Sequence, residues 1–310
     1  MNKLIFYSFL FLILSTNVFS NTIKIISKVN QEVITNYDIQ QEINYLKFLN
    51  PGLKEVVDKK KIFNLGKSSI TKEIIKKKEL ENFLDLNKDY GILEKIENDL
   101  ISKKKLKNKE QLKQLITNAD LNYDEIFVKL KIEAMWNELI YTKFQDSVKI
   151  NESYLLERLR EQKKNLKIRY NYFLNEILFE VSQKENLDEK LNLIKSSIKN
   201  IGFKNTANTY SISDSSKYGG EIGWIKQTQL SDVILDKIIN LEINETSEVI
   251  QSPAGFLVLM ISEKEKIIEP FDEKKNLSLM KNFEANRQLN QFSLIYYKRL
   301  KKNAQIQEYR

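Results

Sequence analysis

The residues that could do chemistry are limited by two absent types. The 310-residue sequence contains no histidine and no cysteine. Thiolate nucleophiles, Ser-His-Asp triads, HExxH zinc sites and iron–sulfur clusters are therefore excluded. Any catalysis must use carboxylates, lysine, tyrosine, hydroxyl groups or the backbone. No calcium loop or zinc spacing occurs, so we expect neither a cofactor nor a metal ion.

Two short motifs give only weak signals for chemistry. Gly66-Lys67-Ser68 imitates the end of a phosphate-binding loop, but the loop's first glycine would stand at position 61, which is a lysine. Asp232 and Asp236 have helical spacing, which favours a solvent-facing charge pair over a pair of catalytic acids. Neither motif predicts nucleotide binding or acid–base catalysis.

The most informative segment is glycine-rich and lies at 210–224. It reads Tyr-Ser-Ile-Ser-Asp-Ser-Ser-Lys-Tyr-Gly-Gly-Glu-Ile-Gly-Trp, and a second segment, Ser-Pro-Ala-Gly-Phe-Leu-Val, follows at 252–258. Five of the eight glycines lie between 202 and 255. Glycines at this density predict tight turns, and the alternation of helical and strand patterns around them predicts a compact α+β unit.

This segment resembles the parvulin family of peptidyl-prolyl isomerases. The turn at 219–224 matches the family pattern GG-x-(I/L)-GW, a predicted helix follows it, and Gly255-Phe256 leads into a final strand. The stretch at 175–178, Asn-Glu-Ile-Leu, resembles the opening strand, where active members have His-Ile-Leu. The resemblance extends further, because 28–39 resembles the start of SurA, a family of periplasmic chaperones, and 274–309 resembles its closing segment.

The resemblance also places the family's site positions on this chain. The family's first and second histidine positions fall on Glu176 and Leu257, and its aspartate or cysteine position falls on Ser213. Its methionine and phenylalanine positions fall on Leu230 and Ile234. An apolar pocket is kept with aliphatic walls, whereas the polar set is lost. One preorganised polar group can contribute ~2.7–4 kcal/mol of transition-state stabilisation. The resemblance therefore implies weak or absent isomerase activity at these degenerate positions.

Helical patterns precede and follow this unit. We expect a hairpin near 23–34 and a helix ending at Leu49 before Pro51-Gly52, then Lys-rich helices with a break at Gly91. The later elements are expected as helices at 122–144 and 151–163, a strand at 167–181, helices at 187–200 and 274–302, and a short strand at 304–307.

The helix at 122–144 carries an unusually bulky apolar band. Four of its members are candidates for substrate binding: Phe127, Leu130, Met135 and Trp136. Two interpretations remain open from the sequence. These side chains form the core of the helical domain, or some of them line a groove for the apolar side chains of another polypeptide.

The first twenty residues have the pattern of a secretory signal. One lysine at position 3 precedes an apolar stretch at 4–14, and small residues flank position 19. The apolar stretch is shorter than the ~20 residues that span a bilayer. We expect cleavage after Ser20 and export to the periplasm. The alternative is an uncleaved anchor, which would make the protein a membrane-bound folding factor resembling PpiD.

The sequence therefore predicts an α+β protein. We expect a signal peptide at 1–20, a helical SurA-like chaperone domain at 21–166, a parvulin-like domain at 167–265, and a C-terminal helix and strand at 266–310 that complete the chaperone domain. The expected function is ATP-independent binding of unfolded or nascent outer-membrane proteins, and of proline- or aromatic-rich segments, in an apolar cleft.

Two other functions remain open. An active prolyl isomerase is the first alternative. A nucleic-acid binder is the least favoured, because the net charge of +8 is small against 50 basic and 42 acidic residues. We expect no nucleic-acid partner and no stable membrane anchor after cleavage.

Overall fold

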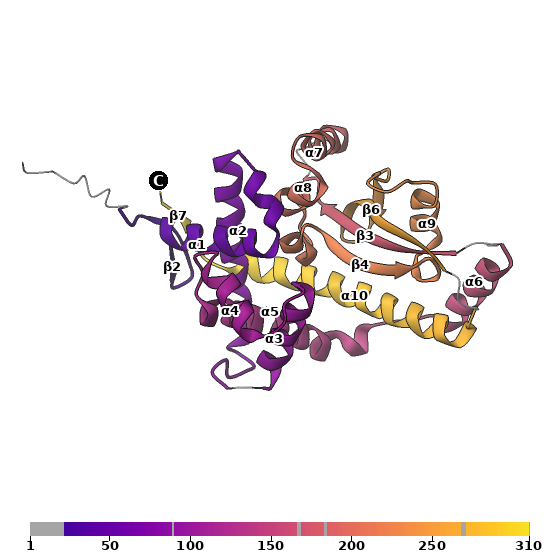
Figure 1. Ribbon diagram of the computed structural model, residues 1–310, viewed down its shortest axis with the longest axis horizontal. Helices are drawn as coiled ribbons and strands as arrows, with labels where there is room; N and C mark the ends of the chain where they lie inside the picture. The colour runs from indigo at the N-terminus through magenta and orange to yellow at the C-terminus, as the bar shows by residue number, and fades with distance from the viewer. Residues whose placement is uncertain (1–21, 89, 166–168, 183–184, 268–270, 310) are drawn as a thin grey trace, which may run out of the picture.

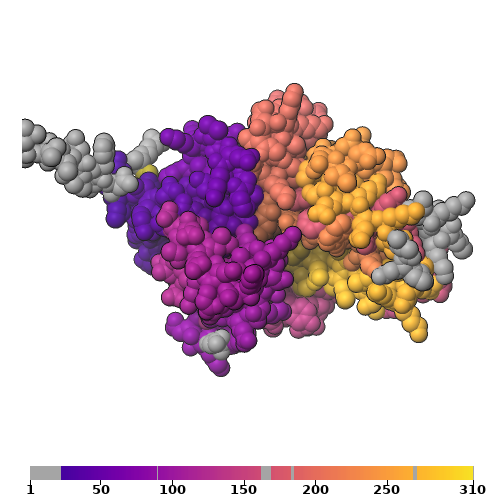
Figure 2. All heavy atoms as spheres, in the orientation of Figure 1, coloured from indigo at the N-terminus to yellow at the C-terminus, as the bar shows by residue number. Residues whose placement is uncertain are grey.

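The computed structural model describes residues 22–88, 90–165, 169–182, 185–267 and 271–309. A helical part and an α+β unit lie side by side, and helix α10 (Glu273–Asn303) extends from the first along the sheet of the second (Figure 1). The space-filling view shows the two parts in contact (Figure 2). The predicted signal peptide lies outside the described residues.

A small antiparallel sheet ties the two ends of the described chain together. Its strand order is β2-β1-β7, with β1 at Ile25–Val29, β2 at Glu32–Thr35 and β7 at Ile306–Glu308. Ser27 of β1 pairs with Glu308 of β7. The predicted hairpin and last short strand are confirmed, and the N- and C-terminal segments pack together as expected.

Five helices follow the hairpin, and polar caps fix where several of them begin. Thr35 starts α1 with a capping box, in which its Oγ1 accepts from the backbone N–H of Asp38. Asn122 caps α5, since its side chain accepts from the backbone N–H groups of Asp124 and Glu125. Gly91, with φ of +72°, precedes α3. These helices are α1 (Asn36–Leu49), α2 (Lys59–Leu80), α3 (Ile92–Lys103), α4 (Lys109–Thr117) and α5 (Tyr123–Phe144).

Helix α5 forms the centre of the helical part. Phe127 and Leu130 are buried in a cluster with residues of α1, α3 and α4. Met135 and Trp136 are buried in a second cluster with residues of α2 and α10, where the Trp136 ring stacks on Tyr296 at 5.7 Å between centroids. All four candidates are therefore core residues. A client groove lined by them is not present, because helices cover α5 on both sides.

The α+β unit has a four-stranded antiparallel sheet of order β4-β3-β6-β5. Helix α6 (Glu152–Asn165) precedes it and packs on α10. Its elements are β3 (Arg169–Phe179), α7 (Leu187–Ile201), α8 (Phe203–Tyr210), β4 (Glu221–Lys226), α9 (Asp232–Ile238), β5 (Ile250–Ser252) and β6 (Gly255–Ile267).

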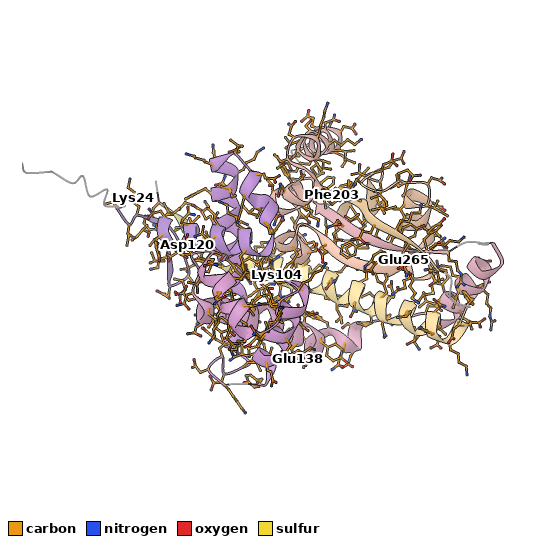
Figure 3. The ribbon with its side chains drawn as sticks, in the orientation of Figure 1. Lys24, Lys104, Asp120, Glu138, Phe203 and Glu265 are labelled. Carbon is orange, nitrogen blue, oxygen red and sulfur yellow. The ribbon has the colours of Figure 1, made fainter. Side chains whose placement is uncertain are left out.

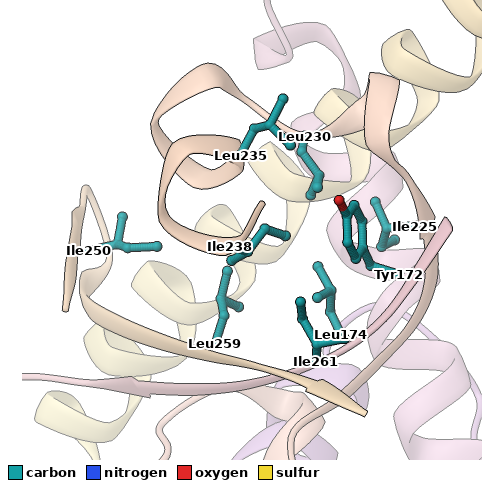
Figure 4. Packing of buried hydrophobic residues seen from close by; sticks show 9 residues of the cluster. All are labelled: Tyr172, Leu174, Ile225, Leu230, Leu235, Ile238, Ile250, Leu259 and Ile261. Carbon is teal, nitrogen blue, oxygen red and sulfur yellow. The ribbon is translucent and has the colours of Figure 1, made fainter. Parts of the chain in front are cut away.

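Alternation along β3 divides the unit into two cores. Tyr172 and Leu174 face α9, whereas Ile177 and Phe179 face α7 and α8. Figure 4 shows the first core, in which Leu230 lies near Tyr172 of β3 and Leu235 of α9. Leu230 is fully buried there, so its side chain supports α9 instead of facing a binding pocket.

The glycine pair of the predicted turn is required by the backbone. Gly220 has φ of +76°, and its carbonyl oxygen accepts a hydrogen bond of 2.7 Å from the backbone N–H of Glu176. A Cβ at this position would overlap the carbonyl oxygen of Glu176 and lie 3.0 Å from the Cβ of Ala207. Any larger residue would push the turn away from β3.

Candidate functional site

A cavity of about 770 Å³ lies where the sheet, α6 and α10 meet. Its volume falls within the roughly 300–1,000 Å³ of ordinary ligand pockets. Four of the five positions carried over from the parvulin resemblance line it: Glu176, Ser213, Ile234 and Leu257. The fifth, Leu230, lies in the core below α9, and the four candidates on α5 lie in the helical core.

The register of the sheet explains why these side chains face the cavity. Successive side chains alternate across a strand, so Glu176 and Leu178 share a face of β3 with Tyr172 and Leu174. On β6, Leu257 shares the same face with Leu259. Residues of α9 cover the buried members of this face. The remaining members line the cavity as an aliphatic wall.

Glu176 is the main polar group on that wall. Its Oε1 accepts hydrogen bonds from Ser213 Oγ at 2.6 Å and from Ser215 Oγ at 2.8 Å. Burial raises the pKa of the Glu176 carboxyl group. The hydrogen bonds from the two serine hydroxyl groups lower this pKa in part, and the negative charge of Asp214 raises it. The environment thus favours the neutral acid more than water does, and a neutral carboxyl group can donate a hydrogen bond into the cavity.

A buried ion network lies directly behind this group. Lys76 Nζ, on α2, lies 2.7 Å from Glu133 Oε2 on α5 and 3.3 Å from Asp214 Oδ1. Lys72, also on α2, pairs with the same Asp214 oxygen, and Lys217 pairs with Glu133. The network joins two helices of the helical part to the short 3₁₀ segment Asp214–Tyr218 of the α+β unit.

The charges of this network stabilise one another. Burial opposes the charge of Glu133, but the ammonium groups of Lys217 and Lys76 outweigh it and lower the pKa of Glu133 to about 2. Burial also opposes the charge of Asp214, yet Lys76 and Lys72 hold the pKa of that carboxyl well below its usual range. Both carboxylates therefore stay ionised near neutral pH, whereas burial of Glu176 favours its neutral form.

Helices α10 and α6 form the opposite wall, which the sequence did not predict as part of the site. The lining residues recur at spacings of three and four along one face of α10: Met280, Phe283, Arg287, Asn290, Leu294 and Tyr297. The sequence predicted this helix, at 274–302. It did not predict the surface that these residues oppose, because that surface belongs to a distant part of the chain.

Arg158 fixes α6 against the same region. Its buried guanidinium donates to the carbonyl oxygens of Leu230 and Thr228, the second at 3.4 Å. Thr228 in turn donates to Asn276 of α10 at 3.0 Å. These bonds hold α6, α10 and the segment before α9 in one arrangement around the cavity.

The two walls of the cavity differ in character. The wall on the sheet is mainly aliphatic, and the wall on α10 mixes polar and aromatic side chains. Within the described ranges, no group of three or more acidic residues is placed to hold a metal ion. Among the helices of those ranges, none combines the length and apolar character needed to cross a membrane.

Comparison with known proteins identifies the α+β unit. Residues 154–265 match the family model described as a PPIC-type PPIase domain. The match begins within α6, earlier than the predicted boundary at 167. The SurA chaperone of Pseudomonas aeruginosa is 23% identical over 162 residues, which cover 50% of this chain and 39% of that protein.

A second SurA chaperone and a solved structure are also similar to this chain. The SurA chaperone of Hydrogenovibrio crunogenus is 32% identical over 85 residues, 27% of this chain and 17% of that protein. The chain therefore matches less than half the length of these curated relatives. A solved SurA-like chaperone structure from Campylobacter jejuni is 17% identical, covers 92% of this chain and 99% of its own, and has a TM-score of 0.38. The predicted resemblance is confirmed: residues 154–265 match a PpiC-type domain, and the chain is similar to SurA chaperones over about half its length.

Proposed function

We propose that this protein is an ATP-independent chaperone that holds an extended segment of an unfolded polypeptide in the cavity between its PpiC-type domain and α10. The observation that carries the proposal is the cavity itself, with an aliphatic wall on the sheet and a mixed wall on α10. A site of this kind accepts many sequences, because apolar contacts are not directional.

The expected affinity is moderate. Each bulky apolar side chain of a client that becomes buried contributes ~1.5–3 kcal/mol before the cost of ordering the chain. A cavity of this size admits only a few such side chains at once. Their sum corresponds to binding in the micromolar range, from which a client can leave without a nucleotide cycle.

The proposed clients are unfolded or nascent outer-membrane proteins in the periplasm. The secretory pattern of the first twenty residues supports export, and the similarity to SurA chaperones supports a protein-folding role. Identification of Asn21 as the N-terminus of the mature protein would support cleavage. A mature protein that starts at Met1 would favour the anchored alternative.

Weak isomerase activity is the second candidate function, and one observation favours it. Glu176 occupies the first histidine position and tends toward its neutral form, so it can offer a hydrogen bond to a peptide carbonyl. Leu257, at the second position, offers none. We therefore expect the PpiC-type domain to be a degenerate one that binds peptide and isomerises proline slowly or not at all.

Two assays on the mature protein test these proposals. The chaperone proposal predicts that the protein slows aggregation of an unfolded outer-membrane β-barrel protein without ATP, and the absence of any effect would contradict it. A proline-containing tetrapeptide assay at fixed temperature tests the domain separately. Turnover at the rate of ordinary parvulins would show that the degenerate positions still support catalysis.

A further inference from the structure

The segment 213–217 faces two sites at once. Ser213 and Ser215 donate their hydroxyl groups to Glu176 at the cavity. Asp214 and Lys217, between and after them, pair instead with residues of the helical part. The serine side chains of this short turn therefore hydrogen-bond to the carboxyl group of the cavity. The charged side chains of the same turn anchor it to the helical part.

The anchor on the helical side is buried and contacted from several elements. Lys76 is fully buried, touches both Glu133 and Asp214, and places its ammonium group 5.2 Å from the centre of the Trp136 ring. Trp136 Nε1 donates to Ser293 Oγ of α10 at 2.8 Å. Because the ammonium has so little freedom, the position of Asp214 is defined by the packing of α2, α5 and α10.

A second contact holds the other side of the turn. The side-chain amide of Asn208, on α8, donates to the carbonyl oxygen of Ser216 at 2.6 Å. Asn50, which follows α1, donates in turn to Asn208 Oδ1. The turn is thus fixed from both domains, and only its two serine hydroxyl groups reach Glu176.

We propose that Lys76 is a positioning residue for the cavity: through Asp214 it holds the turn that presents Ser213 and Ser215 to Glu176, and so it sets the hydrogen bonding of the cavity's carboxyl group from outside the cavity. Lys76 does not line the cavity. This inference rests on the proposed function, because that proposal makes the cavity the client-binding site. Its test needs no client.

The test measures the pKa of the Glu176 carboxyl group in the full mature chain, by carbon NMR across a pH series. In Lys76→Met, Asp214 keeps Lys72 but loses its fully buried partner, so the turn is held less tightly against Glu176. Hydrogen bonds to a carboxylate lower its pKa, so their loss should raise the pKa of Glu176 by about one unit. Ser215→Ala should raise it in the same direction by removing one hydroxyl group directly.

Two further variants separate positioning from other effects. Lys129→Met removes another lysine of the helical part, one that pairs with Glu42 and Glu73 and does not touch the turn, and should leave the pKa of Glu176 unchanged. In a Ser213→Ala/Ser215→Ala background, Lys76→Met should have almost no further effect. The charge of Asp214, which also acts on Glu176, is retained in every variant.

The outcomes decide the inference independently of chaperone activity. An unchanged Glu176 pKa in Lys76→Met, an equal shift in Lys129→Met, or a full shift in the double-alanine background would overturn it. If Lys76→Met does not fold, Lys72→Met removes the other Asp214 partner and should shift the same pKa upward. Failure to bind unfolded protein would contradict the proposed function and leave this result standing.

Discussion

The band on α5 and the wall of the cavity are both apolar, yet one is closed and the other is open. Helices α1, α3 and α4 cover Phe127 and Leu130, and α2 and α10 cover Met135 and Trp136. On the sheet, α9 covers only part of one face, and the face continues into the cavity at Leu257. An apolar stripe in the sequence thus indicates a surface that will be covered. The packing of distant segments decides whether the protein's own helices cover it or it stays open to another molecule.

The largest predicted effect tests the closed region. Trp136→Ala removes a fully buried ring that stacks on Tyr296 and donates to Ser293. We expect it to lower the free energy of unfolding by ~3–5 kcal/mol, measured by urea denaturation. Leu257→Ala, in the half-buried cavity wall, should cost clearly less. Equal losses would contradict the distinction between core and cavity.

The next effect concerns the ion network behind the cavity. Glu133→Gln leaves Lys76 and Lys217 without their shared carboxylate, and should lower the free energy of unfolding by about 3 kcal/mol at neutral pH. Glu138, exposed on the same helix, is the matched control (Figure 3). Glu138→Gln should change the stability by less than ~0.5 kcal/mol.

The same variant has a predicted pH dependence. The pKa of Glu133 is about 2 in the folded protein, below its usual 4.5, so its contribution to stability is present above the higher value and is lost as the pH falls through the lower one. The difference between wild type and Glu133→Gln should therefore shrink on acidification. A difference that stays constant would show that Glu133 acts through packing alone.

A smaller effect is expected for binding at the open region. Val233 is 62% exposed and lines the cavity, whereas Val128 is 54% exposed on α5 and does not. Val233→Asp should weaken binding of an unfolded β-barrel peptide about tenfold, or ~1.4 kcal/mol, with little change in stability. Val128→Asp is the control. Equal affinities, measured by fluorescence anisotropy, would place the client elsewhere.

The smallest effect concerns the carboxyl group of the cavity. The pKa of Glu176 is raised in the folded protein, so its contribution to stability is present at low pH and is lost as the pH rises through the folded value. The side chain of Glu176→Gln cannot ionise, so the variant does not lose this stability as the pH rises. It also keeps an oxygen that can accept hydrogen bonds from the serines. We expect the variant to gain stability relative to wild type at about pH 7 but not at about pH 4. A constant difference would contradict the raised pKa.

The sequence predicted the elements well because their signals are local. The helix at 122–144, the stop at Pro51-Gly52 and the strand at 167–181 were each predicted from residues within or next to the element itself. The glycine pair at 219–220 also carried a local requirement, since a positive φ and a close backbone contact both exclude side chains there. The resemblance supplied four positions of the cavity wall.

The remaining half of the site depends on contacts between distant segments. Arg287 and Tyr297 reach the cavity because α10 crosses from one part of the molecule to the other, which no pattern within 274–302 reveals. Lys76 looked like one of many surface lysines on an amphipathic helix, yet it is fully buried because Glu133 and Asp214 approach it from other elements. Charge alone gave no sign of this burial.

Site-specific photo-crosslinking tests most directly whether the open region holds the client. A photoreactive residue is placed at position 233 in one variant and at position 128 in another, and each is mixed with an unfolded outer-membrane β-barrel protein before irradiation. We expect crosslinks from position 233 and few from position 128. Crosslinks mainly from position 128, with none from 233, would contradict it.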